Sequence, residues 1–173
     1  MNFLKLHYQE VIQRDLILTE VINTTCSFPG PAKFILSIGG GNAGESYVLS
    51  SLFVLKYLIG QHPFVIRQNV YKLNKGEALG GKLTLRGLAM YTFLYRLLFE
   101  ILPKKKYFEG FKDPLHDKIY SFVIEEIFDL EELNYILMHL DQLNSLQCQL
   151  HFNTKSKNEV KVLSQSFFFL LVR

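Results

Sequence analysis

The chain has 173 residues and a net charge of +3; 49% of its residues are hydrophobic and 20% are charged. A chain of this length can bury a core as one ordinary domain, and this composition excludes a disordered chain or a fibrous repeat. The longest stretches without Asp, Glu, Lys or Arg, such as Gln142 to Thr154, are shorter than the roughly 20 apolar residues that span a bilayer, so no membrane insertion is predicted. We therefore expect a single domain over residues 1–173.

The charges are not spread evenly along the chain. Lys56 to Lys112 contains eleven Lys and Arg against three acidic residues, whereas Asp113 to Leu150 contains one Lys against eight acidic residues. A basic segment of this kind suits contact with a phosphate backbone, where each cation displaces condensed counterions. A solvated face of the protein explains the same pattern equally well, and charge alone leaves both interpretations open.

The N-terminal half predicts two helices around a short strand. Apolar residues recur at helical spacing over Tyr8 to Ile22, and the Pro-Gly-Pro sequence at residues 29–31 ends this segment. The apolar run Phe34 to Ile38 predicts a buried strand that leads into glycines. A second helix is predicted over Ser46 to Gly60.

The middle of the chain predicts a long hairpin and a third helix. Residues 63–71 look extended, and a second strand is expected over Lys82 to Leu85, with a projecting loop at about residues 70–82. Gly87 to Leu102 has a dense apolar helix pattern that Pro103 ends.

The C-terminal third adds two strands, over Ile119 to Ile124 and Ser145 to Phe152, with an acidic amphipathic segment, Leu130 to Leu143, between them. A last helix is expected over Asn158 to Leu170. Hairpin-like pairs outnumber clean βαβ units. The predicted fold class is therefore α+β, in two layers, with helices packed on one face of a largely antiparallel sheet.

No motif in the sequence predicts catalysis, a cofactor or a metal. Glycines between Gly39 and Gly44 follow a strand and precede a helix, which suggests a nucleotide-binding loop, but no Lys-Ser/Thr follows them and the spacing is not GxGxxG. Cys26 and Cys148 have no CxxC partner, and the histidines lack paired-ligand spacing. A nucleotide-dependent enzyme using Gly39 to Gly44 remains an alternative hypothesis.

Residues 82–98 carry the strongest family resemblance. Lys82-Leu83-Thr84-Leu85-Arg86-Gly87, followed by Met90, Phe93 and Leu97-Leu98, resembles the K-V-T-L-R-G…M…F…R-L segment of the family of large-subunit ribosomal protein five, the 5S-rRNA-binding proteins of bacteria and organelles. Six further landmarks follow the family's order: His7-Tyr8, Pro31 to Gly41, Gly60-Gln61-His62-Pro63, Phe108-x-Gly110, Tyr120-Ser121 with Glu125-Glu126, and Thr154-Lys155-Ser156.

This resemblance implies a non-catalytic component of the large ribosomal subunit that binds 5S rRNA and large-subunit rRNA in the central protuberance. The implied RNA-binding residues have hydroxyl, amide or guanidinium groups that reach phosphate or 2′-OH oxygens. They are Ser37, Gln61, Arg67, Thr84 and Arg86. Ser37 replaces an asparagine of the family and lacks its amide donor.

The resemblance also implies contacts beyond rRNA. The loop from Lys72 to Gly80 corresponds to the family's projection toward the peptidyl-site tRNA, which Lys72, Asn74 and Lys75 would contact; it is about four residues shorter than the bacterial pattern. Neighbouring proteins of the central protuberance and a small-subunit bridge protein are implied partners. The acidic stretch within residues 113–143 is a candidate for such a protein contact.

Departures from the family pattern indicate a lineage. Glu109 replaces the arginine of the family's Phe-Arg-Gly, and the loop before the late strand is compressed into Lys112 to Lys118. The chain has 15 Phe and no Trp, a skew that fits an A/T-rich genome, and Met1 to Glu10 does not resemble a transit peptide. We therefore predict a mitochondrially encoded protein of the ribosome in the mitochondrial matrix, with a plastid as the alternative. A free regulatory RNA-binding module is the remaining alternative.

Overall fold

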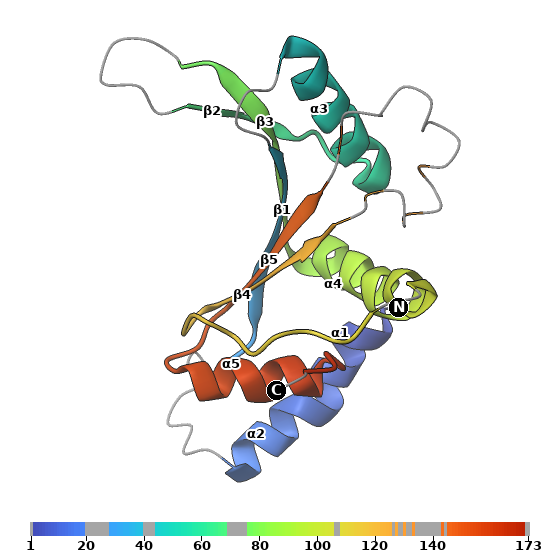
Figure 1. The fold of residues 1–173 in the computed structure, drawn as a ribbon. Helices are drawn as coiled ribbons and strands as arrows, with labels where there is room; N and C mark the ends of the chain where they lie inside the picture. The colour runs from blue at the N-terminus through green and yellow to red at the C-terminus, as the bar shows by residue number, and fades with distance from the viewer. Residues whose placement is uncertain are drawn as a thin grey trace. The chain divides into compact units, whose positions relative to one another are not determined.

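The structure is a computed structural model that describes residues 2–19, 28–39, 44–68, 76–105, 108–125, 127, 130, 133, 143 and 145–171. Five strands form one sheet in the order β2-β3-β1-β5-β4. They are β1 (Pro31–Gly39), β2 (Phe64–Arg67), β3 (Ala78–Leu85), β4 (Ile119–Ile124) and β5 (Leu146–Phe152). Helices pack against this antiparallel sheet (Figure 1), which confirms the predicted α+β class.

The chain divides into two compact units. The first comprises Met1–Phe34, Leu85–Phe122 and Gln149–Arg173, and the second comprises Ile35–Thr84 and Val123–Cys148. The expectation of a single domain stays a prediction. Within the described ranges, no helix is long and apolar enough to cross a membrane.

The N-terminal helical segment begins earlier than its apolar pattern indicates. It runs through α1 (Phe3–His7), the π-helical turn η1 (Tyr8–Ile12) and α2 (Gln13–Thr19). The Asn2 side chain accepts a hydrogen bond from the Leu4 amide at 3.0 Å, which fixes the start of α1. Leu4 is fully buried, so it belongs to the same inward stripe as Ile12. The predicted end at residue 22 lies outside the described residues.

The third predicted helix changes its winding toward its C-terminus. It comprises α4 (Gly87–Arg96), the π-helical turn η3 (Leu97–Ile101) and the 3₁₀ turn η4 (Leu102–Lys104). Gly87 begins the helix with a φ of 57°, a left-handed conformation that favours glycine. Pro103 lies in the last turn, close to the end that the sequence predicts.

Aromatic side chains fill much of the core of the first unit. Phe111 lies within 4.8 to 6.1 Å, between ring centroids, of four other rings, those of Phe108, Tyr120, Phe122 and Phe169. The Tyr120 hydroxyl donates a hydrogen bond to the Lys112 carbonyl oxygen at 2.5 Å. Burial, reinforced by the nearby Asp113 carboxylate, raises the pKa of the Tyr120 phenol. This part of the core therefore contains a neutral, hydrogen-bonded phenol.

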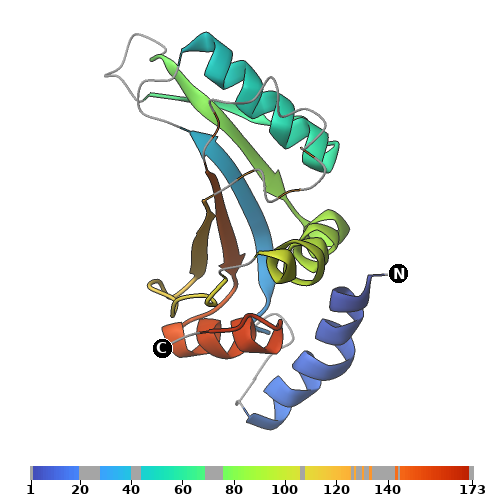
Figure 2. The ribbon, with the colours of Figure 1, turned by 45° about the vertical axis from the view of Figure 1, so that its right-hand side comes forward.

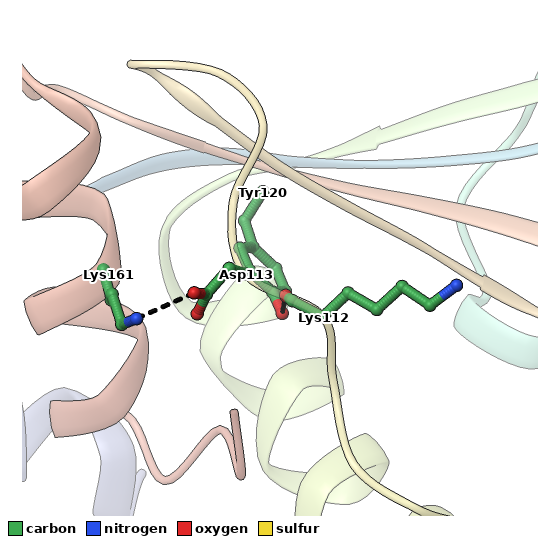
Figure 3. A network of polar contacts seen from close by, with 4 residues as sticks. All are labelled: Lys112, Asp113, Tyr120 and Lys161. Carbon is green, nitrogen blue, oxygen red and sulfur yellow. Dashed lines mark hydrogen bonds and ion pairs between the residues drawn. The ribbon is translucent and has the colours of Figure 1, made fainter. Parts of the chain in front are cut away.

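The last helix, α5 (Lys157–Ser166), packs beside the loop that carries Asp113. The Ser156 side chain caps it by accepting from the Glu159 amide. Lys161 Nζ lies 2.8 Å from Asp113 Oδ2, while the Lys112 side chain extends away from this ion pair (Figure 3). The helix ends four residues before the predicted Leu170. Of the predicted acidic segment at residues 130–143, only the buried Leu130, Leu133 and Leu143 are described.

Candidate RNA-binding surface

Helix α3 (Glu45–Ile59) covers one side of the hairpin formed by β2 and β3 (Figures 1 and 2). A Cβ atom at Gly81 in β3 would lie 3.0 Å from Leu55 Cδ1 and 3.2 Å from Leu52 Cδ2. The helix therefore packs closely on the strand backbone at Gly81, and a larger side chain there would have to displace the ends of these two leucine side chains. Gly60, with a φ of 77°, ends α3 in the left-handed conformation.

The strand register determines which side chains lie on the opposite side of this hairpin. Phe64 pairs with Lys82, and Val65 pairs with Gly81. Directly paired residues of antiparallel strands share a face, and faces alternate along each strand. Val65 therefore shares the helix side with Gly81. Phe64 and Lys82 lie on the other side, together with Thr84, and we call Phe64, Lys82 and Thr84 the open face.

The open face is accessible in the second unit. The Phe64 residue is 73% exposed, Lys82 is exposed and Thr84 is half-buried. The residues that alternate with them, Leu83 and Leu85, are fully buried. The hairpin of β2 and β3 therefore holds a cation, a hydroxyl and an aromatic ring in positions from which they can bind another molecule.

Arg67 lies on the other side of the hairpin from the open face. The pairing shifts between Ile66 and Arg67, so that Arg67 pairs with Ala78. Its side chain lines a cleft of about 700 Å³ between α3 and the hairpin, which is otherwise apolar except for Glu45 and Glu77. Two carboxylates in the same cleft reduce the attraction of Arg67 for phosphate. The structure does not bring Arg67 together with Thr84.

Ser37 lies in β1, beside β5. It is 9% exposed, and its hydroxyl contacts Oε1 of Gln147 at 3.4 Å. Gln147 is exposed and alternates with the fully buried Leu146 and Cys148. Ser37 of β1 therefore lies on the same face of the sheet as Gln147 of β5. The longer Gln147 side chain reaches solvent there.

The remaining predicted residues differ in how much the structure describes. Gln61 is exposed in the turn after α3. Arg86, in the first unit, is exposed and extended, with φ of −141° and ψ of 161°, directly before α4. Lys72, Asn74 and Lys75 lie outside the described residues.

Most of the glycine loop between Gly39 and Gly44 lies outside the described residues. Only its two ends are described, since residues 40–43 are not; Gly44 lines the cleft beside Arg67. Within the described ranges, no three His, Cys, Asp or Glu side chains gather closely enough to bind one metal ion.

Sequence reasoning missed Phe64, Lys82 and Gln147 as surface candidates. The four residues of β2 are Phe-Val-Ile-Arg, and this apolar run does not indicate which side a helix covers. The glycine pair in β3 was the available signal, because a strand glycine often marks a close approach of another element. An exposed sheet face that combines aromatic, cationic and hydroxyl groups is typical of proteins that bind RNA.

The comparisons with known proteins identify the family. A model of the C-terminus of the ribosomal uL5 family matches residues 78–169. Large ribosomal subunit protein uL5 of Borreliella burgdorferi is 28% identical over 178 residues, covering 96% of this chain and 97% of that protein. The corresponding protein of Mycoplasma pneumoniae is 33% identical over 116 residues, 64% of each chain. Large ribosomal subunit protein uL5m of Reclinomonas americana is 30% identical over 176 residues, 96% of each chain.

The chain belongs to the ribosomal uL5 family, whose members include large ribosomal subunit protein uL5 of bacteria. This confirms the family resemblance that begins at Lys82. Membership of a family of structural ribosomal proteins also confirms the prediction that the chain is not an enzyme.

Proposed function

We propose that this chain is a structural component of the large subunit of a mitochondrial ribosome, where it binds 5S rRNA and large-subunit rRNA in the central protuberance. The ribosomal part of this proposal is supported by the family match and by relatives aligned along nearly the whole chain. The mitochondrial part is supported by the similarity to a uL5m protein and by a composition with 15 Phe and no Trp.

The observation that carries the RNA contact is the open face. Lys82 and Thr84 project from β3 on the side that α3 leaves uncovered, and exposed Arg86 follows them at the same spacing of two residues. Ser37 and Gln61 are the other proposed contacts within the described residues. Arg67, which lines the α3 cleft, is the weakest candidate of the set.

Two further contacts belong to the proposal. Lys72, Asn74 and Lys75, which lie outside the described residues, are proposed to meet the backbone of the peptidyl-site tRNA. Neighbouring proteins of the central protuberance and a small-subunit bridge protein are the proposed protein partners, with the acidic stretch in residues 113–143 as the candidate surface.

Sedimentation tests the ribosomal and mitochondrial parts together. Purified mitochondria and plastids are lysed separately, and the protein is followed by mass spectrometry across sucrose gradients. We expect the protein in mitochondrial large subunits and whole ribosomes, retained in moderate salt. Recovery only from light soluble fractions would refute the proposal, and recovery from plastid ribosomes alone would refute its mitochondrial part.

Arg86→Ala tests the RNA contact on the purified chain. Loss of one charge-assisted hydrogen bond should weaken the binding of 5S rRNA by about 1–3 kcal/mol. Binding is measured by filter retention at several salt concentrations, with circular dichroism to verify the fold. An unchanged dissociation constant in a folded variant would remove Arg86 from the proposed site.

A further inference from the structure

We propose that Phe64 stacks on an unpaired rRNA base, and that Lys82 and Thr84 hold the phosphate and ribose of the same stretch of RNA. This inference rests on the proposed function and names a residue and a kind of contact that the family resemblance did not supply. The recognised chemistry is that of a single-stranded nucleotide, in a loop or bulge.

The Phe64 side chain is exposed to solvent. At 73% it is the most exposed phenylalanine of the described residues, although it lies within a strand and not at a chain end. The core side of β2 is already occupied by Val65, which faces α3 through the cleft. The Phe64 ring therefore contributes little to the core of the second unit.

Phe64 has a cation and a hydroxyl group as neighbours on the same face of the hairpin. Lys82 is its direct partner across the ladder, and such pairs have Cβ atoms about 4.5–5.5 Å apart; a diagonal neighbour such as Thr84 is about 7–8 Å away. One nucleotide spans this range. Its base can lie on the ring while an ammonium group meets its phosphate and a hydroxyl meets its 2′-OH or phosphate.

The charge around the ring favours RNA over a protein partner. Among the described residues, the acidic side chains of Glu45 and Glu77 line the cleft on the other side of the hairpin together with Arg67. The open face, defined by Phe64, Lys82 and Thr84, contributes a lysine, and it lies in the basic segment from Lys56 to Lys112. RNA is a polyanion with flat apolar bases, so its bases can stack on the Phe64 ring while its phosphates meet the Lys82 ammonium group.

The test compares variants of Phe64 with a matched control. Phe64→Leu keeps an apolar side chain and removes the ring, whereas Phe64→Tyr keeps the ring. Phe53→Leu is the control, because Phe53 is also an exposed phenylalanine of the second unit, 48% exposed, but lies on α3. Each full-length variant is titrated with 5S rRNA and, separately, with protein-free large-subunit rRNA, at several salt concentrations.

We expect Phe64→Leu to weaken binding of one of the two RNAs by about 5-fold to 150-fold, the range for losing one stacked base. The salt dependence should be unchanged, because no phosphate contact is removed. Phe64→Tyr and Phe53→Leu should bind within about 3-fold of the unchanged chain. The RNA that shows the loss identifies the source of the stacked base.

Three outcomes would overturn this inference while the proposed function stands: equal binding of both RNAs by Phe64→Leu and the unchanged chain, an equal loss in Phe53→Leu, or a defect of Phe64→Leu in joining large subunits without any loss of RNA binding. The last result would indicate a protein neighbour over the ring. Failure of the unchanged chain to bind either RNA would instead refute the proposed RNA contact itself.

Discussion

Replacing Thr154 by valine should lower the free energy of unfolding by about 0.2–2 kcal/mol. Thr154 is only 4% exposed, and its hydroxyl donates a hydrogen bond of 2.6 Å to the Asp117 carbonyl oxygen. Losing this bond and leaving the carbonyl without its donor costs about 1–3 kcal/mol, and the extra buried methyl group of valine offsets up to about 0.8 kcal/mol. The bond joins the second residue after β5 to the turn before β4, beside a backbone bond of 2.8 Å from the Phe152 amide to the Lys118 carbonyl oxygen.

The measurement is urea unfolding followed by circular dichroism, with two controls. Thr154→Ser keeps the hydroxyl and should lose less stability than the valine variant. Thr92→Val removes two exposed bonds of 3.0 Å, one that the Thr92 hydroxyl donates to the Leu88 carbonyl oxygen and one that it accepts from the Asn2 side-chain amide. Water can replace both exposed bonds, so Thr92→Val should lower the free energy of unfolding by less than about 0.5 kcal/mol. Equal effects at Thr154 and Thr92 would show that burial of the Thr154 hydroxyl does not set its contribution.

Three further predictions concern charge, pH and thiol chemistry. Lys82→Gln should reduce the slope of log binding constant against log salt concentration by about 0.7 to 0.9 in rRNA titrations, and Arg67→Gln should reduce it less. The opposite result would place the main phosphate contact in the α3 cleft. Burial raises the pKa of Tyr91 to about 12, above its ordinary value of 10.0. Between these two pKa values the native state keeps the Tyr91 proton while the unfolded chain loses it. The free energy of unfolding is therefore complete below about pH 10 and decreases above it. A urea midpoint that stays constant from pH 9 to pH 11 would contradict this. Burial also raises the pKa of the fully buried Cys148 thiol, so in a Cys26→Ser variant a thiol reagent should react only after urea is added, and rapid reaction of the native protein would contradict the buried position.

The regular elements were predictable where hydrophobic periodicity and local signals agree. Residues 119–124 were predicted as a strand with the bounds that β4 has, and α3 was shifted by one residue at each end. The N-terminal helix was placed too late because its first turn contributes only one buried residue, Leu4, and the capping role of Asn2 was not used. The last helix was extended too far because Phe167 and Phe169 continue an apolar run after α5 has ended.

The candidate site was less accessible to sequence reasoning. Thr84 and Arg86 were identified through a family motif, and the residues themselves gave no reason to separate them from Arg67. That separation depends on the shift in pairing after Ile66 and on the packing of α3, both of which are tertiary features. Phe64 was not singled out, because an apolar residue in a strand is expected to face the core until the covered side is known.

The contact between α3 and Gly81 restricts the order in which this sequence can change. A methyl group at position 81 would meet Leu55 and Leu52 at once, whereas shortening either leucine leaves a cavity that glycine cannot fill. The two kinds of substitution are therefore tolerated better together than apart. In this part of the hairpin, the substitutions that related sequences can accept at position 81 depend on the residues already present at positions 52 and 55.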